Sequence, residues 1–549
     1  MRELVLSAIE GAELLSGGSA LYPVQLTEPQ KRKVAFYSNG TVLHLEEFRW
    51  VSEFKSIENK ARLKNIRIEN FLAVSVAELD EIYAAEKTPE AVVAPVLELE
   101  RQQELRDMID RASREGASDI VIRIVRGHTE VRTRVFGRMK DTDSRSEGSG
   151  AALILAAFAV ASDQGTSSSI MSFMQGALTP KSGLLPPRVE MIRLQYSPTS
   201  EGRGALVMRL KYVAPANEVE INHLGYNSQQ IEDITTMRKR TNGLYILAGK
   251  VSSGKSTTLQ RVLNKMFFEK HREISMYTIE EPVELDLPGA IQVPAKKNPD
   301  GTDGFEGAMK ASLRSDPNII VLGEIRSKDL AYLAIQAVMT GHALWSTVHA
   351  GTALGILDRL TDLGVEGWKL ADPTIVRGLV YQRLTGVLCP HCRITLLDGV
   401  RKKSVDLDLA KKLSALFQKH PEKLYVRGDG CQHCKLGLSG RTVVAETVLT
   451  DPRMLELFSK GDRVTMRQYW LDEKSKGGLG GIPVLHHALS KVGAGICDIN
   501  EVEEEVDLFS VYEREYMHLQ PRLLRDVALL DEQEEKKRQK LIEKMNKGK

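Results

Sequence analysis

Short apolar runs alternate with amphipathic stretches through the middle of the chain. Residues 244–248 (LYILA) are continuously apolar, and further runs occur at 274–279 (ISMYTI), 318–322 (NIIVL) and 343–348 (ALWSTV). Two of the stretches between them repeat apolar residues at i, i+3, i+4 and i+7, which is the spacing of an amphipathic helix. Buried strands that alternate with helices are typical of a parallel sheet covered on both faces. The pattern therefore predicts an α/β domain over residues 226–450.

The part of the chain before this domain has a different pattern. Alternating residues at 43–51 (LHLEEFRWV) predict a strand within a first unit, residues 1–85. The segment 86–95 (EKTPEAVVAP) has two prolines and no periodicity, and it is predicted to be a linker. A helix follows, because apolar residues recur with helical spacing from Leu105 onwards.

Several predicted strands after this helix carry arginines. Strands at 119–125 (DIVIRIV) and 130–136 (EVRTRVF) are followed by two more, which contain Arg193 and Arg209. Arg132 and Arg134 share one face of their strand, because side chains alternate with a period of two. Residues 96–225 are therefore predicted to form a small α+β domain with arginines on its strands.

The chain looks helical beyond residue 450, and its charged end is expected to be either a solvated helix or disordered. We divide it into an N-terminal unit (1–85), a linker (86–95), an α+β domain (96–225), an α/β domain (226–450) with a cysteine-rich element (386–445), a helical part of that domain (451–506) and a tail (507–549).

Composition narrows the function classes. The 549 residues allow three or four domains at roughly 150 residues each. The formal charge of +2, from 75 basic and 73 acidic residues, argues against a polybasic nucleic-acid-binding protein. The longest apolar stretch, 151–162, is shorter than the roughly 20 residues of a spanning helix, and acidic residues interrupt the N-terminal apolar positions. We therefore expect a cytosolic protein that meets membranes only through partners.

A glycine-rich segment follows the first strand of the α/β domain. Residues 249–256 (GKVSSGKS) fit G-x-x-x-x-G-K-[ST] between a predicted strand and a predicted helix, which indicates a triphosphate site. Lys255 is expected to reach the β- and γ-phosphates, and Ser256 to bind Mg²⁺. A chance Gly-Lys turn is the alternative. The residues expected to surround the phosphates are Gly249, Ser252, Ser253, Gly254, Lys255, Ser256 and Thr257.

Acidic residues and a histidine follow the other predicted strands. They are Glu280, Glu281 and Glu284 after the second strand, Glu324 after the third and His349 after the fourth. Ligands bind at the carboxyl ends of the strands in an open α/β sheet, so these groups are predicted to surround the phosphate loop. A carboxylate there can activate water or hold Mg²⁺, although each residue taken alone could simply cap a helix or lie in an exposed loop. Gly323 occupies the position of the usual metal-binding Asp, so metal binding is expected to depend on Ser256, waters and Glu281.

Two C-x-x-C pairs, separated by 38 residues, indicate a metal site. Four thiolates from Cys389, Cys392, Cys431 and Cys434 match tetrahedral Zn²⁺. Such a site leaves no coordination position open, so its predicted role is structural. A redox dithiol and ordinary buried cysteines are the alternatives. Cys497 stands alone and is predicted to be a small buried hydrophobe.

These segments together resemble a known family. The phosphate loop, TIEEPVE, LRSDPNIIVLGEIR, AIQAVMTGH and STVHA, followed by CPHC and CQHC, resemble the secretion ATPases that power type II secretion and type IV pilus assembly. The resemblance covers residues 100–506, and the tetracysteine element is similar to that of the assembly or export branch. Residues 1–85 would correspond to the family's partner-docking domain, without a match of motifs.

The resemblance implies a RecA-like, hexameric motor that hydrolyses ATP with Mg²⁺ and carries Zn²⁺. Glu324 would activate water, Glu281 would lie in the acidic box, and His349 in the histidine box. Arginines of the preceding domain would approach the phosphates across the domain or subunit gap; the candidates are Arg132, Arg134, Arg193 and Arg209.

The implied place of the motor is the cytoplasmic face of the inner membrane. There it would drive assembly of a pilus or pseudopilus through a membrane platform protein, and a cytosolic membrane-associated adaptor is a further implied partner. The alternatives are a type IV secretion or conjugative ATPase that acts on DNA or protein, and a non-hydrolysing nucleotide switch. Departures from the family pattern occur at Glu281, where Asp is usual, at Ala350-Gly351 in place of Thr-Asn, and at Ser327, where Asp is usual.

Overall fold

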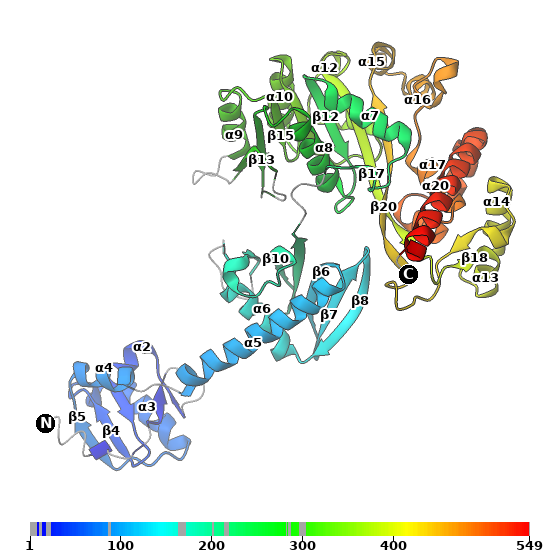
Figure 1. Cartoon of the computed structure of the whole chain (residues 1–549). Coiled ribbons are helices and arrows are strands. Elements are labelled where there is room, and N and C mark those ends of the chain that lie inside the picture. Colours follow the sequence, from blue (N-terminus) through cyan, green and yellow to red (C-terminus); the bar gives the residue numbers. More distant parts are fainter. Residues whose placement is uncertain are drawn as a thin grey trace.

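The computed structural model describes residues 8–9, 12, 14–17, 23–85, 89–162, 172–199, 203–213, 219–281, 283, 287–295 and 304–547. Three folded units follow one another along the chain, and the colours of Figure 1 trace them from blue to red. Among the described residues, no helix carries an apolar stretch long enough to cross a bilayer.

The N-terminal unit is a small sheet flanked by helices. Its strands β3 (Val34–Phe36), β4 (Thr41–His44) and β5 (Asn70–Ala73) lie in the order β3-β4-β5, next to α3 (Ser52–Leu63) and α4 (Val76–Ala85). The strand predicted over 43–51 was wrong in its second half, because β4 ends at His44. The chain then turns into a short 3₁₀ helix that buries Phe48.

A 26-residue helix, α5 (Pro89–Arg114), leads into the second unit. It begins inside the predicted linker, so residues 89–95 are helical instead of an irregular spacer. Pro89 is its first residue, a position that proline tolerates because the first N–H of a helix has no partner within the helix. Residues 86–88 lie outside the described part of the chain.

The second unit is the predicted α+β domain. Six antiparallel strands form its sheet in the order β8-β7-β6-β11-β10-β9, and α5 and α6 (Glu147–Ala159) pack together against it. The strand bounds are β6 (Ala117–Val125), β7 (His128–Val135), β8 (Arg138–Arg145), β9 (Met174–Leu178), β10 (Val189–Pro198) and β11 (Gly204–Tyr212).

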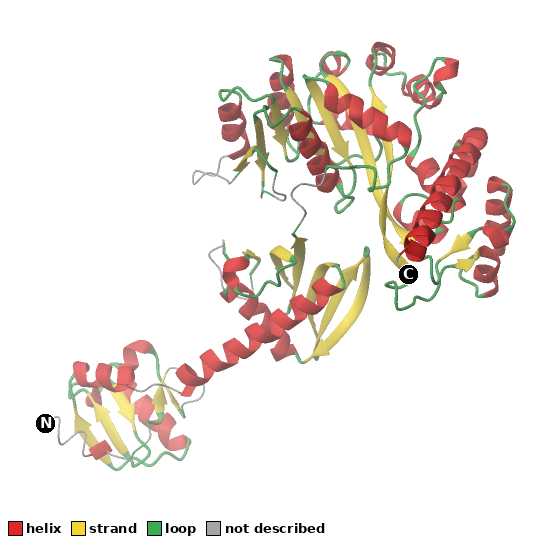
Figure 2. Ribbon diagram, in the orientation of Figure 1, coloured by secondary structure: helices red, strands yellow, loops and turns green. Residues whose placement is uncertain are grey.

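The third unit contains the predicted parallel sheet. Its seven strands lie in the order β14-β13-β15-β16-β12-β17-β20, and only β20 runs antiparallel to its neighbour. The bounds are β12 (Gly243–Ala248), β13 (Met276–Glu280), β14 (Ala290–Pro294), β15 (Ile319–Leu322), β16 (Ala343–Val348), β17 (Val376–Leu388) and β20 (Leu438–Leu449). All four strands predicted from the sequence are present and parallel, and Figure 2 shows helices on both faces of the sheet.

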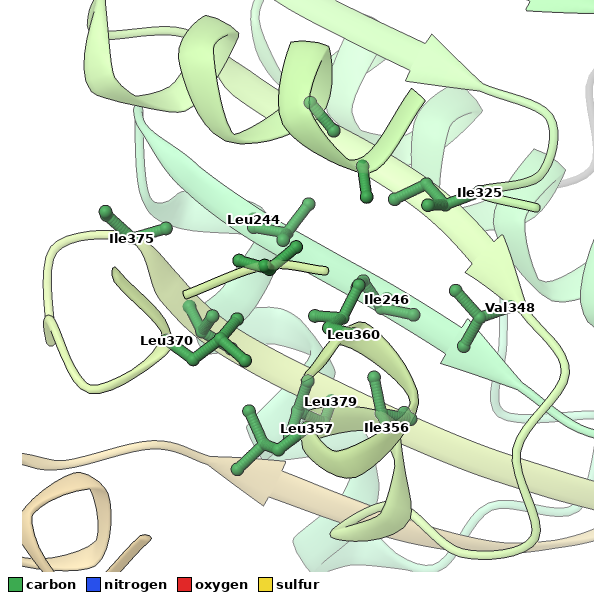
Figure 3. Packing of buried hydrophobic residues seen from close by; sticks show 14 of the residues in the cluster. Leu244, Ile246, Ile325, Val348, Ile356, Leu357, Leu360, Leu370, Ile375 and Leu379 are labelled. Atoms are coloured by element: carbon green, nitrogen blue, oxygen red, sulfur yellow. The ribbon is translucent and has the colours of Figure 1, made fainter. Parts of the chain in front are cut away.

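Alternate residues of β12 enter two different cores. Leu244 and Ile246 pack on one face with residues of α11 (Gly355–Asp362), as Figure 3 shows. Tyr245 and Leu247 pack on the other face with α7 (Ser228–Lys239) and α8 (Lys255–Glu269). Both faces of the strand are therefore buried, which is the reason that its sequence is continuously apolar. The predicted α/β fold is confirmed.

The C-terminal part is helical, as predicted. It contains α15 (Pro452–Ser459), α16 (Arg463–Leu471), α17 (Val484–Gly493), α18 (Ile499–Glu505), α19 (Phe509–Glu515) and α20 (Gln520–Lys547). The tail is not simply a solvated helix, because Leu523 and Val527 of α20 are buried in one core with α14 (Leu407–Phe417) and α17. Cys497 lies in the same core, which agrees with the prediction that it is a small buried hydrophobe.

Candidate functional site

The glycine-rich segment forms the loop between β12 and α8, as predicted. Gly249 and Gly254 have φ values of +153° and +84°, and Gly254 is the N-cap of α8. A Cβ atom at Gly249 would lie 2.4 Å from the carbonyl oxygen of Gln382, so only glycine fits there. The loop thus brings the N-terminus of a 15-residue helix to the carboxyl end of the sheet, where its partial positive charge favours an anion.

The ammonium of Lys255 lies within this loop. Its Nζ donates to the carbonyl oxygens of Gly249 at 2.8 Å and Lys250 at 3.1 Å. These contacts hold the charge beside the helix N-terminus, the position in which a lysine can reach a phosphate chain.

The ends of the neighbouring strands bring the predicted acid and histidine together. Nε2 of His349 lies 3.3 Å from Oε1 of Glu324. The Thr347 hydroxyl donates to the Gly323 carbonyl at 2.7 Å, which fixes the backbone before Glu324. A Cβ atom at Gly323 would lie 3.3 Å from the Ile279 carbonyl oxygen, so the small residue fits a close approach of two strands.

Glu280, the last residue of β13, and the adjacent Glu281 have different hydrogen-bond partners. Glu280 accepts hydrogen bonds from Thr278 at 2.7 Å and from Gln292 at 3.3 Å. Glu281 instead accepts from Arg326 at 2.7 Å. Glu284 lies outside the described residues. The departure at Ser327 has a simple structural explanation, because its hydroxyl accepts from Leu330 N as the N-cap of α10 (Lys328–Met339), a role that Ser fills as well as Asp does.

A cleft of about 570 Å³ joins these groups to the α+β domain. The third unit contributes the loop residues 251–257, Glu280, Glu281, Glu324 and His349. The α+β domain contributes Ser118, Met191, Arg193, Arg209, Leu210 and Lys211. Both units therefore form walls of one cleft.

The four candidate arginines differ in their positions. Arg193 and Arg209 line the cleft, whereas Arg132 and Arg134 are not among the described residues that line it. Arg209 Nε donates to Oδ1 of Asp119 at 3.0 Å, and Arg134 Nε lies 3.4 Å from Oδ2 of the same carboxylate. Because the Asp119 side chain is only 4% exposed, it is a fixed anchor for both guanidinium groups.

Other basic residues line the cleft without having been singled out from the sequence. They are Lys211, Arg326 and Arg441. Arg441 lies seven residues after Cys434 in the sequence, and no pattern in the sequence analysis marked it as a cleft residue. Together with Lys255, Arg193 and Arg209, they make the cleft suitable for a polyanion.

The four paired cysteines lie in a cluster at the far end of β17 and β20. The Sγ–Sγ distances are 3.8 Å for Cys389–Cys431, 3.6 Å for Cys392–Cys434 and 3.8 Å for Cys431–Cys434. A tetrahedral Zn²⁺ with Zn–S distances of about 2.3 Å requires sulfurs about 3.8 Å apart, whereas a disulfide requires about 2.05 Å. All four cysteines are free and their sulfurs lie within 4.8 Å of one another, so the donor set fits Zn²⁺.

A phosphate loop opposite an arginine-bearing domain, together with a tetracysteine cluster, defines a nucleotide-binding protein of the secretion ATPase class. Residues 99–504 match the family described as Type II/IV secretion system protein, and the chain belongs to that family. The resemblance indicated by the motifs is thus confirmed.

Relatives with known roles include secretion and pilus ATPases. The chain is 30% identical over 371 residues to the type II secretion system ATPase E of Vibrio cholerae, covering 66% of this chain and 67% of that protein. It is 29% identical over 406 residues to the type IV pilus assembly ATPase PilB of Thermus thermophilus, covering 71% and 42%. Among solved structures, the pilus retraction motor PilT with bound ADP aligns with a TM-score of 0.48 at 19% identity, covering 74% of this chain and 98% of PilT.

Proposed function

We propose that this chain is an ATP-hydrolysing motor that assembles a type IV pilus or a type II secretion pseudopilus. The observation that carries the proposal is the composite cleft, in which the phosphate loop and Glu324 face Arg193 and Arg209 of a separate domain. Nucleotide bound there would contact both domains, so its hydrolysis could change their relative position.

Glu324 is the proposed general base. Its carboxylate lies in the cleft with the phosphate loop. His349 Nε2, 3.3 Å from the carboxylate, can orient it or share the proton that it takes from water. Lys255 and the guanidinium of Arg209 would stabilise the charge on the transferred phosphoryl group. Asp119 holds Arg209 in place, as the ion pair at 3.0 Å shows.

The residues of the cleft also fit Mg²⁺. Ser256, Glu280 and Glu281 all line it, and hydroxyl and carboxylate oxygens, completed by water, are the ligands that Mg²⁺ prefers. Ser256 is the proposed direct ligand. Once bound, the ion would neutralise charge on the β- and γ-phosphates. The Glu281 carboxylate accepts a hydrogen bond from Arg326. It would therefore bind Mg²⁺ through a water molecule, or directly after its side chain changes position.

The proposed assembly is a homohexamer at the cytoplasmic face of the inner membrane. An inner-membrane platform protein would receive the motion, and a cytosolic membrane-associated adaptor would bind the N-terminal unit. The names of the relatives support a role in secretion or pilus assembly, since they include ATPases of both processes. The tetracysteine cluster is proposed to bind structural Zn²⁺ and to close the long excursion between β17 and β20.

Two substitutions test the hydrolytic function. Glu324→Gln keeps the shape of the side chain but removes the base, so turnover is expected to fall by about 100- to 10,000-fold while nucleotide still binds. Lys255→Ala is expected to abolish binding. Glu456→Gln is the matched control, because it removes an exposed carboxylate that does not line the cleft.

Unchanged turnover in Glu324→Gln would contradict the assignment of the base. Hydrolysis that DNA stimulates in a salt-sensitive manner would favour the conjugative alternative over pilus or pseudopilus assembly.

A further inference from the structure

A buried chain of hydrogen bonds connects the phosphate loop to the segment that joins the two domains. Gln382 Nε2 donates to the Ser253 carbonyl of the loop at 2.8 Å, and Gln382 Oε1 accepts from the Tyr226 hydroxyl at 2.5 Å. Because Tyr226 has one proton to donate, the Thr258 hydroxyl, 3.1 Å away, must donate to it. Gln382 and Thr258 are at most 1% exposed, and Tyr226 is 5% exposed.

Gln382 is also in contact with both ends of the loop. A Cβ atom at Gly249 would lie 2.4 Å from its carbonyl oxygen, and one at Gly254 would lie 3.2 Å from its Nε2. Strand β17, which carries Gln382, pairs in parallel with β12, the strand that leads into the loop. A single residue therefore donates to the Ser253 carbonyl of the loop and lies close to both of its terminal glycines.

Tyr226 ends the segment 219–226, here called the connector, which lies within the described chain between β11 and α7. The connector lies along one face of α8. Arg261 donates to the Glu220 carbonyl at 2.7 Å, and Lys265 Nζ donates to the Glu220 carboxylate at 2.7 Å. Together with Thr258, these residues lie at i, i+3 and i+7 of the helix that begins at the phosphate loop.

The other side of the connector is held by α17. Lys491 Nζ donates to the Gly225 carbonyl at 2.7 Å, and a Cβ atom at Gly225 would lie 2.0 Å from Oγ1 of Thr442. Because Gly225 has a φ of +112°, this close approach requires glycine. The connector is thus fixed on both sides at the point where Tyr226 turns toward the loop.

We propose that Tyr226 and Gln382 are positioning residues that join the phosphate loop to the connector. They hold the Ser253 carbonyl in place and so keep the loop N–H groups aimed at the phosphates. They also transmit movement of the loop to the connector, and hence to the arginine-bearing domain. The second part rests on the proposed function, whereas the first needs only that nucleotide binds. Burial raises the pKa of Tyr226, so its hydroxyl keeps the proton that this chain of hydrogen bonds requires.

Tyr226→Phe in the full-length protein tests the proposal. The substitution leaves the aromatic ring but removes one donor and one acceptor, so the Kd for a fluorescent ADP analogue is expected to rise about tenfold. Tyr245→Phe is the matched control. Its hydroxyl donates to the Asn242 carbonyl at 2.8 Å, at the end of β12 that lies opposite the loop, and its ring is similarly buried. This control is expected to bind the analogue within twofold of the wild type.

Gln382→Met and the double variant with Tyr226→Phe complete the test. If the two residues act as one chain, the double variant is expected to bind no more weakly than Gln382→Met alone. Hydrogen exchange provides a second readout: in the wild type the analogue is expected to slow exchange in residues 219–226, and in both single variants this slowing is lost. Tyr226→Phe binding as tightly as Tyr245→Phe, or additive losses in the double variant, would overturn the proposal. Hydrolysis by the wild type is measured separately, so failure of the ATPase function would be distinguishable.

Discussion

One arginine makes two of the contacts between the two domains that line the cleft. Arg138, at the start of β8, donates from Nε to Glu501 at 2.8 Å and from Nη2 to Glu504 at 2.6 Å. Both glutamates belong to α18 of the third unit, so these ion pairs join the α+β domain to it. Arg138→Ala is therefore expected to loosen the arrangement of the domains without touching the cleft.

The structure gives the size of the effect. The Glu501 side chain is 4% exposed, and a charge-assisted hydrogen bond to such a group contributes about 2 kcal/mol. The Glu504 side chain is 59% exposed, so its ion pair adds well under about 1 kcal/mol. A loss of about 2 kcal/mol shifts the balance between joined and separated domains roughly 30-fold.

Single-molecule energy transfer between one dye on each domain measures this balance directly. Arg427→Ala is the matched control, because Arg427 donates to the same Glu501 oxygen at 2.9 Å from within the third unit. It is expected to keep the wild-type distance distribution, whereas Arg138→Ala is expected to broaden it toward longer distances. An unchanged distribution in Arg138→Ala, or the same change in both variants, would refute the reasoning.

Two further predictions concern the cysteine cluster and a buried acid. Metal analysis of the purified protein is expected to find about one Zn²⁺ per chain, lost in Cys431→Ser together with about 10 kcal/mol of local stability; metal-free protein with four titratable thiols would contradict the site. Burial, reinforced by Glu501 and opposed by Arg427, raises the pKa of Asp498 to about 6. The unfolded value is about 3.9, so Asp498 costs stability as the pH rises from 4 through 6, up to about 3 kcal/mol. Asp498→Asn is expected to be more stable than the wild type at pH 7.5 and equal at pH 4, measured by denaturant unfolding; equal stability at both pH values would exclude this effect.

Within the parallel sheet, the strands that could be predicted from the sequence are those buried on both faces. Leu244–Ala248 and its three parallel neighbours are apolar throughout, because helices cover the sheet on either side. The long strands β17 and β20 were not predicted. Polar residues such as Gln382 and Glu446 are buried within them and have hydrogen-bond partners that lie far away in the sequence. The pattern of polar and apolar residues cannot show that a buried polar side chain has a hydrogen-bond partner.

Errors at the two ends of the chain have local causes. The alternation at 43–51 continues only by coincidence after His44, because Phe48 is buried from a 3₁₀ turn instead of a strand. The prediction of a solvated helix or a disordered end rests on the charge-dense second half of the tail, whereas the first half supplies Leu523 and Val527 to a core. Each segment changes its structure or its burial partway along, and a prediction made for the segment as a whole could not show that change.

Some parts of the candidate site are defined by neighbouring residues in the sequence, and others by residues that are far apart in it. The phosphate loop and the cysteine pairs are defined by spacing, so sequence was sufficient to place them. The choice between Arg209 and Arg134 was not open to sequence, because both pair with Asp119 and only the three-dimensional arrangement places Arg209 in the cleft. Gln382 was missed for a related reason, since its partners Ser253 and Tyr226 are 129 and 156 residues away.

Helix α18 contacts both the α+β domain and the phosphate loop, so it bears on the proposed coupling of hydrolysis to domain motion. Its acidic side chains contact Arg138 of the α+β domain, and its Glu505 also contacts Lys250 of the phosphate loop. A nucleotide bound as proposed would bring negative charge to the same loop and to Arg193 and Arg209 across the cleft. Its phosphates would therefore compete with α18 for Lys250 while adding new attraction between the domains. Because a ligand shifts a conformational balance only by its difference in affinity for the two states, this exchange of partners is where such a difference can arise.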